Sequence, residues 1–248
     1  MINIKNKQEI ELMRQAGNIV ARVLQEMEDN IRPGVATGHL NKRAEKLIRK
    51  EGGEPAFLGY QGFPASICVS VNEELVHGIP GVRRLQEGDI VSIDVGVNYR
   101  GFCGDAAKTF PVGEISSEAG RLLEVTREAL QKAIEQLQEG NFLSDLSHAV
   151  QTFVEKQNYS VVRNYVGHGI GRQMHEEPQV PNFGPPGKGP RLQKGITLAI
   201  EPMVNEGTCE VEVLEDNWTV VTKDRRLCAH FEHTVGLTEN GPDILTIM

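Results

Sequence analysis

The sequence predicts an α+β fold made of two similar halves, with a functional site where the halves meet. Long helical segments precede strand-like segments twice along the chain. Residues 31–53 also resemble residues 137–157 at an offset of 106, which aligns Gly34 with Gly140. No Pro/Ser-rich linker or block of like charge divides the 248 residues, so we expect one domain over residues 1–248.

Four segments have the spacing of amphipathic helices. In the first, Ile10 and Met13 begin a helical repeat of apolar residues, which Arg32-Pro33-Gly34 breaks. A cap at Ser116 or Ser117 begins the third. The predicted helices cover residues 7–27, a segment through 40–48 that ends near 52, a segment from the serine cap to about 138, and residues 143–156.

The strands are predicted from alternation and from β-branched content. Residues 90–97 alternate cleanly, with Val91, Ile93 and Val95 on one face. The glycine-rich segment 167–171 is predicted to be a loop. The other predicted strands cover residues 66–71, 102–110, 196–204, 211–214, 218–222 and 230–237.

Charge and cysteine content narrow the class of function. The net charge of −8 argues against nucleic acid or an anionic membrane as the main partner. The four cysteines form no CxxC pair, so we expect free thiols in a reducing compartment. Residues 1–13 lack the apolar core of a signal peptide, and no apolar run is long enough to span a bilayer, so a cytoplasmic protein is expected.

Two aspartates lie on strands that are predicted to form a hairpin. Asp94 shares a strand face with Ser92 and Gly96, whose small side chains leave room around a carboxylate. With Tyr99-Arg100 at the tip, the hairpin would set Asp94 directly opposite Asp105. Adjacent carboxylates repel, and a divalent metal ion compensates them. A solvated sheet face is the alternative, but these aspartates lie among apolar or small residues, which favours the metal.

Two glutamates are isolated acids in apolar strands. Glu201 lies in residues 197–204, and Glu232 lies in residues 229–235. A buried, unpaired carboxylate is costly, so each of these positions indicates a cation. A buried salt bridge would explain one such residue, whereas four acids of this kind favour one shared metal centre.

Histidines are candidates for the remaining ligand. His168 has glycines on both sides, which permit a close approach of the backbone. His77 and His175 are further functional candidates, while structural roles are expected for the histidines at positions 39, 148 and 233. Four carboxylates and a neutral histidine carry −4, which two divalent ions would balance. Such ligands suit Mn, Fe(II), Co or Zn without selecting among them.

Seven segments, in order and along nearly the whole chain, resemble the type I methionine aminopeptidases. They are residues 72–80, 94–96, 104–110, 167–171, 175–178, 201–203 and 231–234. The resemblance implies the pita-bread fold, in which pseudo-twofold halves share a central antiparallel sheet covered by helices. The short interval from His168 to Glu201 leaves no room for the insertion of type II enzymes, which indicates the bacterial or organellar form.

The resemblance also implies a role for each ligand. Asp94 would bind one metal ion, Asp105 and Glu232 would bridge both ions, and His168 and Glu201 would complete the other site. His77 and His175 would be catalytic, substrate-facing histidines, and Glu201 would also be the general base. The implied reaction removes the N-terminal methionine from nascent polypeptides whose second residue is small. The implied partners are these peptides and, transiently, the ribosome, and a monomer is expected.

A side-chain pocket for methionine is implied as well. Met174 stands where an aromatic residue is common, and Ala65 replaces a frequent lysine. Phe57 is bulkier than the usual residue, so these departures concern the shape of the pocket. Besides the two catalytic histidines, the implied pocket residues are Phe57, Tyr60, Phe63, Cys68, Met174 and Trp218.

Two alternative functions are compatible with the fold. Prolidases and other proline-specific aminopeptidases share it, but they usually carry a large additional N-terminal domain, which we do not expect in 248 residues. Non-catalytic binding proteins of this fold have lost metal ligands, whereas all five ligand positions are filled in this sequence.

Overall fold

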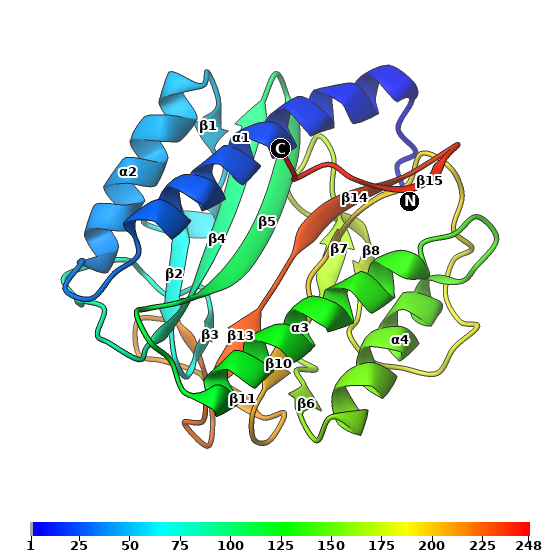
Figure 1. Cartoon of the computed structure of the whole chain (residues 1–248). Helices are drawn as coiled ribbons and strands as arrows, with labels where there is room; N and C mark the ends of the chain where they lie inside the picture. Colours follow the sequence, from blue (N-terminus) through cyan, green and yellow to red (C-terminus); the bar gives the residue numbers. More distant parts are fainter. Residues whose placement is uncertain (1) are drawn as a thin grey trace.

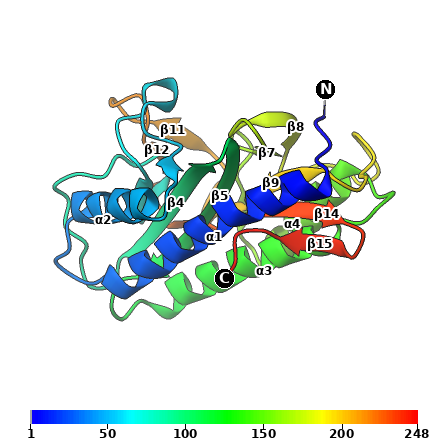
Figure 2. The same ribbon diagram turned by 90° about the horizontal axis from the view of Figure 1, so that it is seen from above.

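The computed structural model describes residues 2–248, in which helices cover one side of a set of antiparallel sheets (Figure 1). Figure 2 shows α1 and α3 along one side of the molecule and the strands β8 and β11 on the other side. The α+β fold predicted from the sequence is therefore confirmed.

The helices lie close to the predicted segments. Asn6 caps the first, because its side chain accepts from the Glu9 N–H while the Glu9 carboxylate accepts from the Asn6 N–H. Ser116 caps the third through the N–H of Ala119. Within residues 2–248, none of the helices combines the length and the apolar character that a membrane crossing requires. The helices are α1 (Lys7–Asn30), α2 (Thr37–Lys50), α3 (Ser117–Glu135) and α4 (Leu143–Lys156).

The strands form four antiparallel sheets, two of which carry most of the functional site. In the first sheet, β4 (Ile90–Tyr99) pairs with all three other strands. These are β1 (Glu54–Pro55), β2 (Cys68–Val71) and β5 (Phe102–Pro111). The second has the order β15 (Gly241–Ile244), β14 (His233–Thr238), β9 (Thr197–Ile200), β7 (Gly167–Gly169), β8 (Glu176–Val180). The third sheet has the order β13 (Cys228–His230), β10 (Met203–Asn205), β6 (Ser160–Val161). The fourth has the order β11 (Val211–Val213), β12 (Val220–Thr222), β3 (Glu74–Val76).

The internal repeat corresponds to equivalent turns in the two halves. Gly34 precedes α2 and Gly140 precedes α4, and both have a left-handed backbone, with φ of 88° and 91°. The Gly34 N–H donates to the Leu85 carbonyl at 2.7 Å, and the Gly140 N–H donates to the Leu192 carbonyl at 3.0 Å. Each glycine thus joins the start of a helix to the segment that leads into a main strand, β4 in one half and β9 in the other.

Each half has its own hydrophobic core. Val20 and Ile48 bury α1 and α2 against β2, β4 and β5. Leu122 and Val150 bury α3 and α4 against β9 and β14. A third cluster, which contains Phe57, lies between the halves and borders the site described below.

The hairpin of β4 and β5 differs in register from the prediction. Its turn is Arg100-Gly101, one residue later than the predicted Tyr99-Arg100. Both turn residues have positive φ, 51° and 80°, as a type I′ turn requires, and glycine favours this conformation at the second position. The predicted pairing of Asp94 with Asp105 is wrong: Asp105 lies opposite Gly96, and Asp94 lies diagonally from it on the same face.

Two long predicted strands are each interrupted at a glutamate. Glu201-Pro202 separates β9 from β10, and Phe231-Glu232 separates β13 from β14. Because β9 pairs with β14 and β10 pairs with β13, both interruptions lie at the same level of the paired strands. Proline cannot donate a ladder hydrogen bond, which accounts for the first interruption.

The predicted loop at residues 167–171 is wrong for its first three residues. Gly167–Gly169 form β7 between β8 and β9 in the five-stranded sheet. A Cβ atom at Gly169 would collide with the backbone carbonyl of Glu177, so glycine is required for this close approach of strands.

Candidate metal centre

The four predicted acids and His168 converge between the two halves. The His168 Nε2 atom lies 3.6 Å from Glu201 Oε1 and 3.9 Å from Asp105 Oδ2. Asp105 and Glu232 are almost completely buried, with 4% and 2% of their surface exposed. One ligand atom from each of Asp105, His168 and Glu232 can lie within 4.8 Å of the others, which is a spacing that can hold a metal ion.

The buried carboxylates raise one another's pKa. Burial, followed by repulsion from Glu201, raises the pKa of Asp94 to about 7. Burial and the neighbouring Asp94 raise the pKa of Asp105 well above its usual range. Burial also raises the pKa of Glu201 and of Glu232. A cation at this cluster would stabilise the ionised carboxylates.

Unpartnered oxygens provide an independent test of the fit to a metal. Asp94 Oδ1, Asp105 Oδ1 and Glu232 Oε1 are buried and have no hydrogen-bond partner among residues 2–248. Buried polar atoms are nearly always partnered, so these orphaned acceptors need a donor or a cation. Hard oxygen donors with imidazole nitrogen match divalent transition metals, and the residues therefore fit a metal centre.

The orientation of His168 suits a ligand. Its Nδ1 donates to the carbonyl of Gly169 at 2.9 Å, which leaves the lone pair of Nε2 directed at the acids. Burial lowers the pKa of His168 to about 4, so the imidazole is neutral at physiological pH. The backbone carbonyl of Gly169 therefore holds the ring in place.

His230 was missed by the sequence prediction. It lies at the end of β13, and its Nε2 is 3.4 Å from Glu201 Oε2 and 4.0 Å from Glu232 Oε2. Its position two residues before Glu232 in an apolar strand is a signal that could have revealed it, because alternate strand residues share a face.

The two predicted catalytic histidines border the acids. The Nδ1 atom of His175 lies 2.7 Å from the Tyr60 hydroxyl, and its ring centroid lies 4.3 Å from that of His168. His77 follows β3 with a φ of 60°, an uncommon conformation for a residue with a side chain. Burial lowers the pKa of His77 to about 4, so this imidazole is also neutral.

A cavity of about 250 Å³ connects the acids with aromatic walls. Phe63 and Trp218 form one wall, with ring centroids 5.1 Å apart in an edge-to-face arrangement. Met174 does not line the cavity but is buried behind it, near Gly96 and Phe57. The lining residues are Phe57, Tyr60, Gln61, Phe63, Cys68, His77, Asp94, Asp105, His168, His175, Glu201, Trp218 and Glu232.

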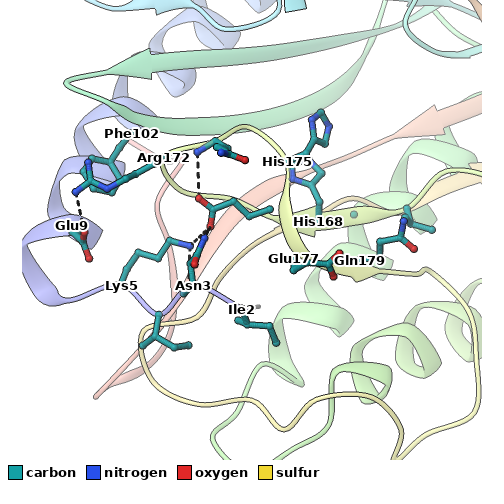
Figure 3. Close-up of a pocket in the computed structure, with 15 residues that line it drawn as sticks. Ile2, Asn3, Lys5, Glu9, Phe102, His168, Arg172, His175, Glu177 and Gln179 are labelled. Carbon is teal, nitrogen blue, oxygen red and sulfur yellow. Dashed lines mark hydrogen bonds and ion pairs between the residues drawn. The ribbon is translucent and has the colours of Figure 1, made fainter. Parts of the chain in front are cut away.

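A larger cavity, of about 860 Å³, is lined partly by residues of β7 and β8. Figure 3 shows Lys5 and Asn3 of the N-terminal segment in this cavity, and His168 and His175 at one end of it. The Lys5 ammonium forms a buried salt bridge with Glu176 at 2.6 Å. The two histidines therefore separate a polar cavity from the cavity that contains the acids.

The chain is similar to known metallopeptidases over almost its whole length. The profile of metallopeptidase family M24 matches residues 11–239. Methionine aminopeptidase 1 of Bacillus subtilis is 56% identical over 246 residues, which cover 99% of each chain. The crystal structure of the methionine aminopeptidase of Thermotoga maritima superposes with a TM-score of 0.99 at 51% identity, over 100% of both chains. The prolidase of Pyrococcus furiosus shares the fold, with a TM-score of 0.80 at 24% identity, and the chain covers 65% of it.

Proposed function

The chain belongs to metallopeptidase family M24 and, within it, to the methionine aminopeptidases, and we propose that its buried centre hydrolyses the first peptide bond of its substrates. The observation that carries the proposal is the cavity itself, where aromatic walls end at four acids and a neutral imidazole. An apolar pocket beside such a centre would hold a methionine side chain and place its carbonyl at the acids.

The proposed centre holds two divalent metal ions. Asp94 would bind one ion, His168 and Glu201 the other, and Asp105 and Glu232 would contribute to both. When bound, two such ions acidify a water molecule and polarise the substrate carbonyl. Their +4 charge would balance the four carboxylates, whose pKa values are raised by burial and, for Asp94 and Asp105, by repulsion from neighbouring acids. Several metals suit these ligands, among them Co, Mn, Fe and Zn.

Three residues of the chain would handle protons and charge during the reaction. Glu201 lies at the cluster and would accept the proton of the attacking water as general base. His175 would donate a hydrogen bond to the negative charge that develops on the carbonyl oxygen. Tyr60 supports this role, since its hydroxyl contacts Nδ1 and leaves Nε2 free for the substrate. His77, which also lines the cavity, would contact the nitrogen of the scissile amide.

The proposal extends to the substrates and their cellular setting. The cavity of about 250 Å³ is smaller than the ~300–1,000 Å³ typical of ligand sites, so it suits one side chain and a small second residue. Nascent polypeptides that begin with methionine are the expected substrates. Because nascent chains are made in the cytoplasm, we propose that the protein acts there, as a monomer that meets the ribosome transiently. Gel filtration and co-sedimentation with ribosomes would measure these two properties.

Peptide hydrolysis in the presence of different metals tests the function. The metal-loaded chain should release methionine from Met-Ala-Ser and should leave Xaa-Pro peptides intact. His175→Ala should keep its metal but turn over about 10²-fold more slowly, because one donor to the oxyanion is lost. Cleavage of Xaa-Pro peptides in preference to Met-Ala-Ser would instead assign a prolidase activity. Absence of both metal and peptidase activity would favour a binding protein.

A further inference from the structure

We propose that Lys5 and Glu176 form a clamp that positions His175 for the reaction, so that the segment before α1 contributes to catalysis without touching the substrate. The inference rests on the proposed function, because His175 is the residue through which the clamp acts. Lys5 and Glu176 line the larger cavity but not the cavity of the acids, whereas His175 lines both. The two residues are therefore positioning residues and not catalytic ones.

His175 lies at the edge of the five-stranded sheet, where the backbone has few partners. It immediately precedes β8, which ends the strand order and pairs with β7 alone among residues 2–248. The register of this pairing also shifts between His168 and Gly169. An edge strand has unpaired backbone groups along one side, so the sheet holds the start of β8 from one side only. A side chain that must be placed accurately at position 175 therefore needs further support.

Lys5 and Glu176 form a buried ion pair in the larger cavity (Figure 3). The Lys5 Nζ atom lies 2.6 Å from Glu176 Oε2, and only 5% and 4% of the two side chains are exposed. Asn3 Nδ2 donates to the same oxygen at 3.1 Å, and Lys5 Nζ also donates to the Asn3 carbonyl at 3.0 Å. Although burial would raise the pKa of Glu176, the hydrogen bonds from Lys5 and Asn3 lower it, so the carboxylate is ionised at neutral pH. Charge-assisted hydrogen bonds of this kind are short and directional.

Both partners of the clamp are themselves anchored. The N–H of Lys5 donates to the carbonyl of Gly195 at 2.8 Å, which ties the N-terminal segment to the residues that lead into β9. Glu176 Oε1 accepts the N–H of Gln173 at 3.3 Å and so closes the turn before β8. A Cβ atom at Gly171 would lie 2.4 Å from Lys5 Cε, which shows how closely this turn packs on the lysine side chain. The clamp therefore joins the turn to the interior of the sheet.

His175 thus has one support for its ring and another for its backbone. The Tyr60 hydroxyl contacts Nδ1 at 2.7 Å and orients the ring. Glu176, the next residue along the chain, is held by Lys5 and fixes where the backbone places that ring. A hydrogen bond to the developing oxyanion needs both supports, because a misplacement of about 1 Å can cost ~10²-fold in rate.

A double-mutant cycle between Lys5→Met and His175→Ala, measured on the Mn²⁺-loaded full chain, tests the clamp. With Met-Ala-Ser as substrate, Lys5→Met should lower kcat about tenfold and leave KM and the Mn²⁺ dissociation constant within about twofold of wild type. In the His175→Ala background the same change should lower kcat by less than about twofold, because the residue on which the clamp acts is gone. Lys7→Met is the matched control, since it removes an exposed ion pair with Glu239 from the same end of the chain and should leave kcat unchanged.

A second variant separates the position of His175 from the stability of the fold. Lys5→Met alone leaves the Glu176 carboxylate buried without its partner and should lower Tm. Lys5→Met/Glu176→Leu buries no charge and should have a Tm close to that of the wild type. Apolar contact is not directional, so kcat of this double variant should still be about tenfold low, and it replaces Lys5→Met in the cycle if the single variant does not fold.

The outcomes separate the clamp from the proposed function. Wild-type kcat in Lys5→Met or in Lys5→Met/Glu176→Leu would overturn the clamp while the function stands. Equal losses of kcat with and without the His175 side chain would also overturn it, since the effect would then not pass through His175. A loss of Mn²⁺ affinity large enough to explain the lower rate would assign the pair a role in metal binding instead. A wild-type chain that binds Mn²⁺ but cleaves no methionyl peptide would overturn the proposed function, and the clamp with it.

Discussion

The two halves of the molecule each supply a pair of acids, but they present them differently. The N-terminal half carries Asp94 and Asp105 within the continuous strands β4 and β5. The C-terminal half carries Glu201 just after the end of β9 and Glu232 just before the start of β14. A shared Leu-Gln-Xaa-Gly segment, at residues 85–88 and 192–195, precedes β4 and β9. Aligning these segments places Glu201 at the position of Asp94.

The difference shows that side-chain length and backbone geometry compensate for each other. The shorter aspartates lie on a fully paired hairpin, where Gly96 opposite Asp105 leaves space for the side chains of Phe57 and Met174. The longer glutamates lie where the strands are interrupted, and the backbone groups there form hydrogen bonds with other segments. The N–H of Glu232 donates to the carbonyl of Ala107 at 2.8 Å, and the carbonyl of Glu201 accepts from the Asn182 amide at 3.0 Å. The interruptions therefore also connect the C-terminal acids to neighbouring segments.

The largest loss of metal affinity and activity is expected when an acid is removed. The loss should be larger for an acid of the C-terminal half than for one of the N-terminal half. Two groups of three potential donors lie close enough to hold a metal ion, one formed by Asp105, His168 and Glu232 and the other by Glu201, His230 and Glu232. Glu232 belongs to both groups, whereas Asp94 belongs to neither. We expect Glu232→Ala to lose metal affinity by more than ~100-fold, together with nearly all activity. Mutation of a residue that only hydrogen-bonds to a metal ligand already costs ~10–100-fold in metal affinity or activity. Asp94→Ala should lose less. Metal content after dialysis and turnover of Met-Ala-Ser measure both variants, and a smaller loss in Glu232→Ala would reverse the ranking of the halves.

Replacing a carboxylate ligand by its amide allows the two halves to be compared at the aligned positions 201 and 94. Glu201→Gln keeps an oxygen donor but cannot accept a proton, so kcat should fall by roughly 10²–10⁴-fold while metal remains bound. Asp94→Asn, at the equivalent position, should affect metal content more than kcat per bound metal. Unchanged kcat in Glu201→Gln would remove it as the general base.

Removal of the metal should make stability depend on pH. The pKa of Asp94 is about 7 in the folded chain against an ordinary value of 3.8, so the folded state holds the proton more tightly. The resulting stabilisation is complete below pH 3.8 and is lost as pH rises through about 7. Chelator-treated chain should therefore show a Tm that falls between about pH 4 and 7 relative to the metal-loaded chain and levels off above pH 7.

One variant provides the control for this dependence of Tm on pH. Asp94→Asn should flatten it, because the amide does not ionise. A Tm difference between chelated and loaded chain that stays constant across this pH range would contradict the electrostatic account of the cluster.

The smallest effect is expected at the pocket wall of the N-terminal half. A Cβ atom at Gly96 would lie 2.6 Å from Met174 Cε and 2.6 Å from Phe57 Cε1. Since the end of a methionine side chain can move, Gly96→Ala should raise KM for methionyl peptides a few-fold and leave Tm nearly unchanged. Gly104→Ala is the contrast, because its Cβ would meet the backbone nitrogen of Gly17 at 2.8 Å and should cost about 1–3 kcal/mol in stability. A lower Tm in Gly96→Ala than in Gly104→Ala would refute this assignment.

Patterns local to one segment were predictable from the sequence. Helical periodicity and the serine cap located all four helices, because these signals depend on neighbours along the chain. The isolated acids in apolar segments were identified for the same reason, and the structure brings Asp94, Asp105, Glu201 and Glu232 together. The alignment of Gly34 with Gly140 correctly indicated the duplicated architecture.

Features that depend on distant segments were not predictable in this way. The register of the hairpin follows from a turn type that needs positive φ at both Arg100 and Gly101, and alternation alone does not specify it. His168 was placed in a loop because glycine usually breaks strands, whereas here the close approach of β8 requires glycine. His230 went unnoticed because a histidine in an apolar strand acquires meaning only when Glu201 is packed beside it.

The contact between Arg14 on α1 and Asp243 on β15 has a consequence for the order in which the molecule is made. The two side chains lie 229 residues apart in sequence and form a salt bridge at 2.5 Å. During synthesis, at roughly 5–20 residues per second, α1 therefore lacks this partner until β15 has been translated. Contacts of such long sequence separation also slow folding. The N-terminal helix thus waits for nearly the whole remaining chain before its final packing surface is complete.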